Sequence, residues 1–171
     1  FALVSSPTLR AAIEMALRYV HLTFTFAQFS VVEADGEALL YMEDRAIPEE
    51  VRQFLVERDF AAIQNMFQEA LGMRIPIKYI DFRFAEPSYK PQFETVFGLM
   101  PQFGQAQNCV AFDARFLDLP LPQANEHTKL MCETMCRELL QQRRARQGLA
   151  SRIRDRMLQM PLVFPDMEVI A

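Results

Sequence analysis

The N-terminal residues have the apolar spacing of an amphipathic helix. Ser6 suits a helix cap, and Pro7 suits the first helical position that follows it. Apolar residues then recur every three or four positions, at Leu9, Ile13, Leu17 and Val20. We therefore predict a helix over about residues 7–20.

A two-residue alternation follows this helix. Every second residue in Leu22–Phe26 is apolar, and the alternation then shifts by one position so that Phe29 and Val31 continue the same face. Such a shift predicts a strand that contains a bulge.

A hairpin and a long helix come next. Asp35-Gly36 is a typical hairpin turn, and Leu39–Met42 supplies the returning strand. Apolar positions at helical spacing begin after Pro48 and stop at Gly72, which predicts a helix between these two residues. That helix is long enough to cover one face of the sheet.

The rest of the chain continues this mixture of short elements. The pattern predicts, in order, a strand over residues 75–84, a short helix over residues 91–97, a strand over residues 108–112, a single turn capped by Asp113, an extended Leu119–Pro122 run, and an amphipathic helix from Asn125 to about Gln147. This order of elements predicts an α+β fold with a mainly antiparallel sheet covered by helices.

The composition is that of a globular protein with one proper core. The chain has 171 residues, of which 51% are hydrophobic and 23% charged. Its apolar runs fall far short of the roughly 20 residues that span a bilayer, and no secretory leader pattern opens the chain. Three cysteines without framework spacing fit a reducing compartment. We expect a cytoplasmic protein without a membrane segment.

The net charge of −4 is unevenly distributed. Residues 1–136 hold 11 basic against 18 acidic residues, a balance of −7, whereas residues 137–171 hold 7 arginines against 4 acidic residues, a balance of +3. A basic segment on an acidic body indicates contact with nucleic acid or with an acidic surface, or else a solvated helix face. Composition alone favours the solvated face.

The residues that catalysis and metal binding require are sparse. Neither His21 nor His127 has the serine, cysteine or carboxylate neighbourhood of a catalytic triad. His127, Cys132 and Cys136 have helical spacing and could share a metal, but two apolar core thiols on a capped helix explain them better, since the sequence has no second ligand cluster with structural-zinc spacing. The five scattered glycines form neither a P-loop nor a dinucleotide fingerprint. We predict no catalytic site, no metal and no cofactor.

The chain is rich in aromatic residues, with 15 phenylalanines and four tyrosines. Many lie on predicted strands, where they either fill the core or enclose a small-molecule pocket of the usual apolar kind. Our candidate pocket residues are Phe24, Phe26, Tyr41, Tyr79, Phe82, Arg83 and Phe112.

Three segments carry a family resemblance through their order and spacing: SSPTLRAAIEMALRYV, IDFRFAEPSYKPQFETVFG and NCVAFDARFLDLPLPQANEH. The matching features are Thr8-Leu9, Pro87, Phe97-Gly98, Phe103-Gly104, Phe112 followed by Leu117, and the Leu119–Pro122 run. The combination resembles the N-terminal arabinose-binding-type regulatory domain of AraC-family transcriptional regulators, from Phe1 to about Glu138. The resemblance implies a domain that senses a small-molecule effector and forms a homodimer.

The C-terminal part resembles the start of the same family's DNA-binding domain. Leu149–Leu158 is similar to its first helix and Phe164–Ala171 to the opening of its first helix-turn-helix, while the sequence ends before a recognition helix. The resemblance implies a regulatory domain over residues 1–147 and an incomplete DNA-binding domain over residues 148–171. It also places three residues close to DNA: Arg152, Arg154 and Arg156.

These features predict the effector-sensing part of a bacterial AraC-type regulator, which would control transcription through a DNA-binding domain. Two other classes stay open. One is an effector-free dimerisation module of such a regulator. The other is a small enzyme with a carboxylate in the aromatic pocket, for which the sequence offers no convergent acid-base set.

Overall fold

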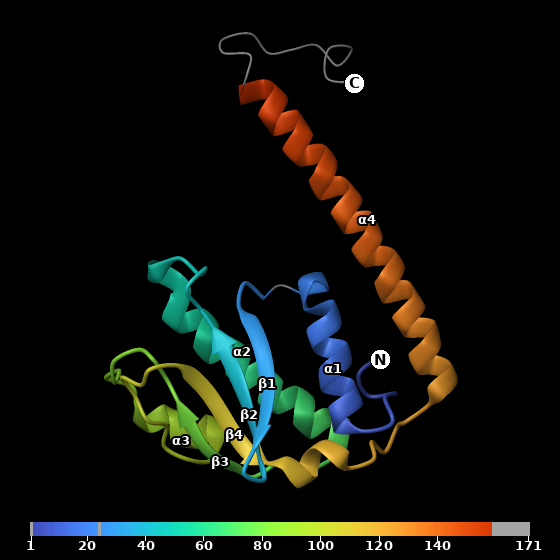
Figure 1. The fold of residues 1–171 in the computed structure, drawn as a ribbon. Helices are drawn as coiled ribbons and strands as arrows, with labels where there is room; N and C mark the ends of the chain where they lie inside the picture. Colours follow the sequence, from blue (N-terminus) through green and yellow to red (C-terminus); the bar gives the residue numbers. More distant parts are fainter. Residues whose placement is uncertain (1, 24, 159–171) are drawn as a thin grey trace.

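A computed structural model gives the structure of the protein and describes residues 2–23 and 25–158, with the backbone alone described from residue 144 to residue 158. The elements are α1 (Leu9–Tyr19), the 3₁₀ turn η1 (Val20–Leu22), β1 (Gln28–Ala34), β2 (Glu37–Glu43), α2 (Glu49–Leu71), β3 (Ile77–Asp81), α3 (Pro91–Phe97), β4 (Asn108–Asp113), the 3₁₀ turn η2 (Ala114–Asp118) and α4 (Glu126–Leu158). The predicted α+β class with an antiparallel sheet is confirmed (Figure 1).

The strands form one antiparallel sheet in the order β1-β2-β4-β3. β1 and β2 make the predicted hairpin, in which Val31 lies opposite Leu40. Its turn residues, Asp35 and Gly36, have φ values of 51° and 78°, and a two-residue hairpin turn of type I′ requires positive φ at both positions. β4 lies between β2 and β3, so Val110 pairs with Leu40 on one side.

The strand predicted from Leu22 begins later, because two threonine side chains form hydrogen bonds outside the sheet. The hydroxyl of Thr23 donates to the Val20 carbonyl oxygen at 2.6 Å and closes η1. The hydroxyl of Thr25 donates to Asp59 of α2 at 2.7 Å. Such side-chain bonds compete with the hydrogen bonds of a sheet. The strand prediction is therefore wrong at the described residues before Gln28, where β1 begins.

The first helix is capped by Thr8 and not by the predicted Ser6. The Thr8 hydroxyl accepts a hydrogen bond from the Ala11 N–H at 3.3 Å. Thr8 itself is extended because this segment pairs with the run near residue 120, and the Leu9 N–H donates to the Leu119 carbonyl oxygen at 3.2 Å. The helix therefore begins at Leu9, two residues after the predicted start at Pro7.

Helices α1 and α2 pack on one face of the sheet, where two adjoining clusters form the core. The first cluster joins α1, η2 and the end of α2 to Ala38 and Phe112. In the second, Phe60 of α2 packs with Met42 and with Phe82, a fully buried ring. Burial along β2 alternates accordingly, since Ala38, Leu40 and Met42 are buried on this face while Leu39 and Tyr41 are half-buried on the opposite face.

The last helix, α4, projects away from the body of the domain (Figure 1). Asn125 caps it as predicted, because its side-chain oxygen accepts from the Thr128 N–H at 2.9 Å. The helices predicted separately over Asn125–Gln147 and Leu149–Leu158 form one continuous helix, with no break near residue 148. No helix in the described part of the chain combines the length and apolar character needed to cross a membrane.

Candidate functional site

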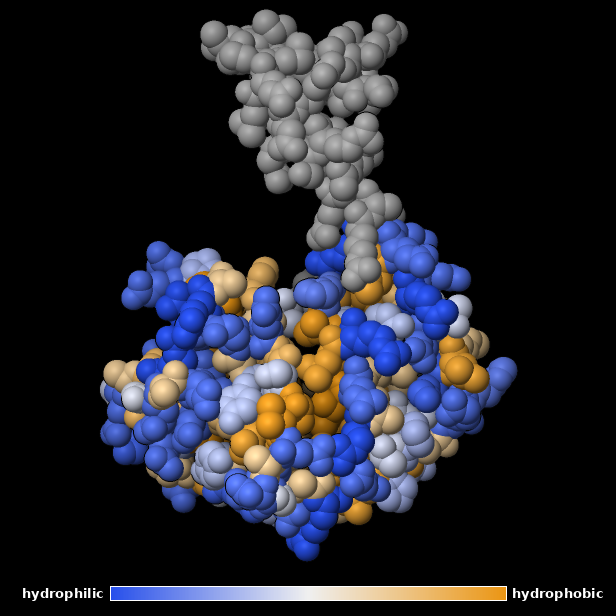
Figure 2. Space-filling view, in the orientation of Figure 1, coloured by the Kyte–Doolittle hydropathy of each residue, from blue (hydrophilic) through white to orange (hydrophobic). Residues whose placement is uncertain are grey.

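A cavity of about 540 Å³ opens between α1, α2 and the first two strands. Its volume lies within the range of small-molecule pockets. Figure 2 shows apolar residues gathered around a hollow in the middle of the molecule, between α1 and β1. It is far larger than a second pocket among the described residues, which holds about 20 Å³.

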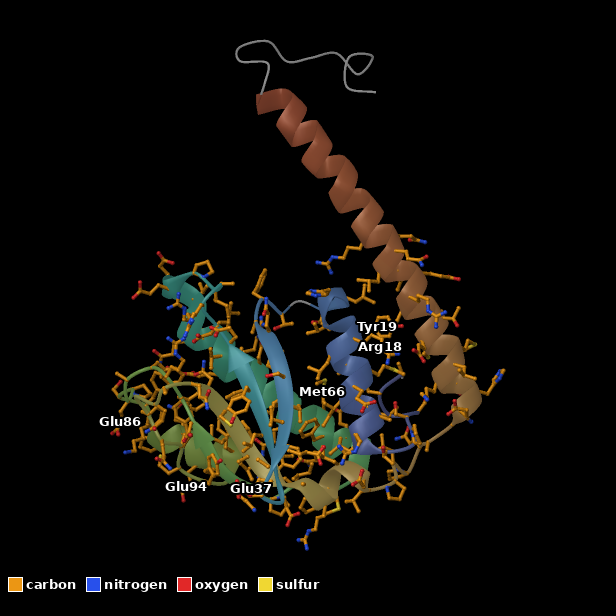
Figure 3. All side chains as sticks on the ribbon, in the orientation of Figure 1. Arg18, Tyr19, Glu37, Met66, Glu86 and Glu94 are labelled. Carbon is orange, nitrogen blue, oxygen red and sulfur yellow. The ribbon has the colours of Figure 1, made fainter. Side chains whose placement is uncertain are left out.

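Two helix faces supply most of the cavity wall. From the first helix and η1, the lining residues at helical spacing are Ile13, Ala16, Leu17 and Val20. From α2 they are Asp59, Ala62, Ile63, Met66 and Phe67. Phe29 and Leu40 complete the wall on the sheet side. The alanines contribute short side chains, which leaves room between the helices, and Figure 3 shows Met66 in the space between β1 and α1.

The charged side chains of the described wall are Arg58 and Asp59, and they bind each other. The Arg58 guanidinium donates to Asp59 Oδ1 through Nε at 2.8 Å and through a terminal nitrogen at 2.6 Å. The Thr25 hydroxyl donates to the other carboxylate oxygen, Oδ2, at 2.7 Å. Asp59 is 7% exposed, so this carboxylate is held by partners on both oxygens in a nearly buried position.

The cavity also reaches α4, through Cys136. Burial raises the pKa of the Cys136 thiol, so that this part of the wall stays uncharged. Two polar contacts tie the same stretch of α4 to the first helix region: Arg18 pairs with Glu133 at 2.7 Å, and the Arg143 guanidinium donates to the carbonyl oxygen of His21. The cavity wall and these two contacts thus join the region of α1 and η1 to α4.

A family model described as the arabinose-binding domain of AraC transcription regulators, N-terminal part, matches residues 1–121. The chain belongs to this family. Figure 1 places the cavity-forming elements α1, β1, β2 and α2 inside the matched region, with α4 beyond it.

Two relatives are regulators, and a solved structure shares the fold. An uncharacterised HTH-type transcriptional regulator of Mycobacterium tuberculosis is 31% identical over 176 residues, which cover 100% of this chain and 51% of the relative. The ornithine utilization regulator of Pseudomonas aeruginosa is 28% identical and is covered to 50%. The crystal structure of the transcriptional regulator CdpR from Pseudomonas aeruginosa shares the fold, with a TM-score of 0.61 and 15% identity over 75% of this chain and 42% of CdpR. The chain thus spans about half the length of the curated relatives it matches.

The pocket residues predicted for this AraC-type domain lie elsewhere than the large cavity. Of the six that the structure describes, none lines it. Phe26 is 66% exposed, and Phe24 lies outside the described residues. Tyr41 follows the cavity residue Leu40 along β2 and therefore points to the other face of the sheet. Tyr79 shares that outer face, since Tyr41 and Tyr79 pair with the alternate residues Cys109 and Ala111 of β4.

The remaining predicted pocket residues belong to the core or to an ion pair. Phe82 is fully buried among rings, and Arg83 pairs with the buried Asp44. Phe112 stacks edge-on against Phe67 at 5.8 Å and lines a void of about 20 Å³, which has room for roughly one water molecule. The sequence signal for the larger cavity is the apolar spacing along α1 and α2, and not the aromatic residues of the strands.

Two further predictions concern α4. Arg152, Arg154 and Arg156 fall on its C-terminal stretch, and their side chains lie outside the described residues. Cys132 is half-buried and free, and Cys136 lines the cavity. In the described ranges, no three histidine, cysteine or acidic residues gather as metal ligands.

Proposed function

We propose that this chain is the effector-sensing region of a bacterial AraC-type regulator, with the effector bound in the cavity between α1, α2 and the sheet. The observation that carries this proposal is the wall itself, because one cavity joins both helices, the hairpin and Cys136 of α4. In this proposal the protein acts on transcription in the cytoplasm and performs no catalysis.

Signalling would run from the cavity to α4. A ligand shifts a protein between two arrangements only if it binds one of them more tightly. The cavity meets α4 at Cys136, and the Arg18–Glu133 ion pair connects α1 to the same helix. We infer that effector binding favours one position of α4 relative to α1. The helix would then transmit this change in position to the DNA-binding domain.

A homodimer through α4 fits the same arrangement. Met131, Met135 and Leu139 are 53–55% exposed and recur every four residues, so they form one apolar stripe on α4. An antiparallel pairing of two copies centred on Met135 would place Met131 of one copy against Leu139 of the other. The stripe is thus complementary to itself.

Light scattering tests the dimer. We expect Met135→Glu to convert the dimer into a monomer, because it buries a charge at the centre of the pairing. Gln141→Glu adds the same charge at an exposed position about 120° away around the helix and is the matched control. A strictly monomeric wild type at high concentration would sink the dimer proposal.

For DNA binding, we propose that residues 1–147 form the regulatory domain and residues 148–171 open a helix-turn-helix domain. Arg152, Arg154 and Arg156 would then lie close to the phosphate backbone. In a full regulator, reversing the charge of Arg152 and Arg154 should weaken DNA binding on all sequences and flatten its salt dependence. An unchanged salt slope would mean that this part of α4 faces solvent.

The sensing role itself can be tested without knowledge of the promoter. Residues 1–171 are fused to a repressor DNA-binding domain that acts only as a dimer, and reporter expression is followed while candidate compounds are added. A compound that changes repression by the wild type and fails with a cavity-filled variant supports the proposal. If no compound shifts either the reporter or the melting temperature, the chain is an effector-free dimerisation module, which is the alternative function.

A further inference from the structure

We infer that the effector is an uncharged, predominantly apolar molecule with at most one polar end. This inference rests on the proposed function, since it takes the cavity as the effector site. The family is described by arabinose, a compact molecule with a hydroxyl on most of its carbons. The wall of this cavity has few free hydrogen-bonding groups for such a ligand.

Two of the three hydroxyls in the described wall already donate a hydrogen bond inside the protein. The Thr23 hydroxyl donates to the Val20 carbonyl oxygen, and the Thr25 hydroxyl donates to Asp59. Tyr19 supplies the remaining hydroxyl of the described wall. A sugar would exchange several hydrogen bonds with water for apolar surroundings, and each polar group left unsatisfied costs about 1–3 kcal/mol. A ligand with one polar end avoids this cost.

Charge leads to the same conclusion. Arg58 and Asp59, the charged residues of the described wall, form an ion pair with two hydrogen bonds to one carboxylate oxygen. A carboxylate ligand would have to compete with Asp59 for Arg58, and an ammonium ligand would have to compete with Arg58 for Asp59. In either case the ligand would bring a charge into an apolar cavity, and the wall residue of opposite charge would already be paired. Burying an unpaired charge in this way is strongly unfavourable.

The rest of the wall favours apolar contact. Its helix faces carry Ile13, Leu17, Ile63 and Met66, and the sheet side carries Phe29. Methionine adapts its shape to irregular apolar ligands, and burying apolar surface is the main source of affinity available here. The volume of about 540 Å³ is more than three times that of a cavity of about 150 Å³ that holds benzene. Medium-length alkyl or fused-ring molecules therefore match the cavity in both size and polarity.

A set of ligands with one tail and different heads tests the inference. Fluorescence of the neutral dye N-phenylnaphthylamine reports occupation of the cavity in the 171-residue chain. Competitors are decanol, decanoate and decyltrimethylammonium, each below its micelle concentration, together with arabinose and ornithine. We expect decanol to displace the dye at a concentration at least about ten-fold lower than either charged analogue, with no displacement by arabinose or ornithine. Equal or better competition by decanoate, arabinose or ornithine would overturn the inference.

A pair of variants assigns the binding to the cavity. Met66 lines the cavity and is 39% exposed, whereas Met73 is 46% exposed and lies after α2, away from the cavity. Met66→Glu should weaken decanol about ten-fold or more and improve the cationic analogue, while Met73→Glu should change neither. If both variants bind decanol as the wild type does, the dye reports another surface and the inference is refuted.

The outcomes separate the inference from the proposed function. If a charged molecule or a sugar binds and Met66→Glu alters its affinity, the cavity is still an effector site and the ligand class proposed here is wrong. If no compound in the set binds and no added compound changes the reporter fusion, both proposals fail together.

Discussion

Filling the cavity should stabilise the fold and weaken ligand binding at the same time. Ala16 lies in α1, is half-buried and lines the cavity, so that Ala16→Phe would point a ring into the open space. A cavity of about 540 Å³ accepts one phenyl ring without overpacking, since about 150 Å³ is enough for benzene. Most substitutions of a core residue by a larger one destabilise a protein. An increase in stability on Ala16→Phe would therefore be specific evidence for the open space.

The magnitude follows from opposing terms. Burying a phenylalanine side chain contributes about 1.5–3 kcal/mol relative to an exposed one. Its lower helix propensity costs about 0.5 kcal/mol, and fixing its rotamer costs about 0.5–1 kcal/mol. The net gain is about 1 kcal/mol, or a rise of about 2–4 °C in Tm for a chain of this size. Decanol should bind at least about ten-fold more weakly, because the ring occupies its space.

Thermal unfolding and dye displacement measure the two effects on the same sample. Ala11→Phe is the matched control: Ala11 is also a half-buried alanine of α1, but it does not line the cavity. We expect this control to leave decanol affinity unchanged. If Ala16→Phe lowers Tm and leaves decanol affinity as it was, the open space between α1 and α2 does not exist in solution.

Three further predictions concern the core, a buried carboxyl and the link to α4. Phe82 is fully buried against several rings, so Phe82→Ala should lower the free energy of unfolding by about 3–5 kcal/mol in denaturant titrations. Burial raises the pKa of Asp81, and its Oδ1 is buried without a partner in the described structure. The folded protein therefore binds the Asp81 proton more tightly than the unfolded chain does, and stability is lost as pH rises through the pKa of the folded state. Asp81→Asn should raise Tm at about pH 7, where the buried carboxylate of the wild type is charged. This gain in Tm should disappear toward about pH 4, where the carboxyl is protonated. Arg18→Glu should change Tm little, because Arg18 is well exposed, yet it should reduce the effector response of the reporter fusion, and Glu133→Arg in the same chain should restore it.

Most of the fold could be predicted because its signals are local. The turn at Asp35-Gly36, the helix stop at Gly72 and the cap at Asn125 each act within a few residues, and all three are confirmed. The segment after α1 differs from its prediction for the opposite reason. Its residues alternate as in a strand, but the Thr25 hydroxyl donates to Asp59, which is 34 residues further along the chain. Local spacing cannot report such a distant partner.

The cavity was harder to predict because alternation does not say which face of a sheet receives the helices. Leu40 and Tyr41 are neighbours on β2, and both are apolar enough to face a pocket. The structure places Leu40 toward α1 and α2, and Tyr41 on the other face. The choice depends on packing between elements that are distant in sequence. Ala16 and Ala62 have short side chains among bulkier residues on the two helix faces, and they leave space that larger side chains would fill in a close-packed interior.

The proposed cavity and the proposed dimer stripe meet on one helix, at adjacent residues. Cys136 lines the cavity, and Met135 lies at the centre of the exposed stripe, about 100° away around α4. A ligand that presses on Cys136 would therefore tilt the helix that carries the dimer contact. From Cys136 to Leu158 the helix extends about 33 Å at 1.5 Å per residue, so a tilt of about 5° moves its end by about 3 Å. Two such helices in a dimer would change the spacing of whatever follows them. In the proposed mechanism, an apolar ligand near Cys136 would thus set the geometry at the far end of α4 without any contact to DNA.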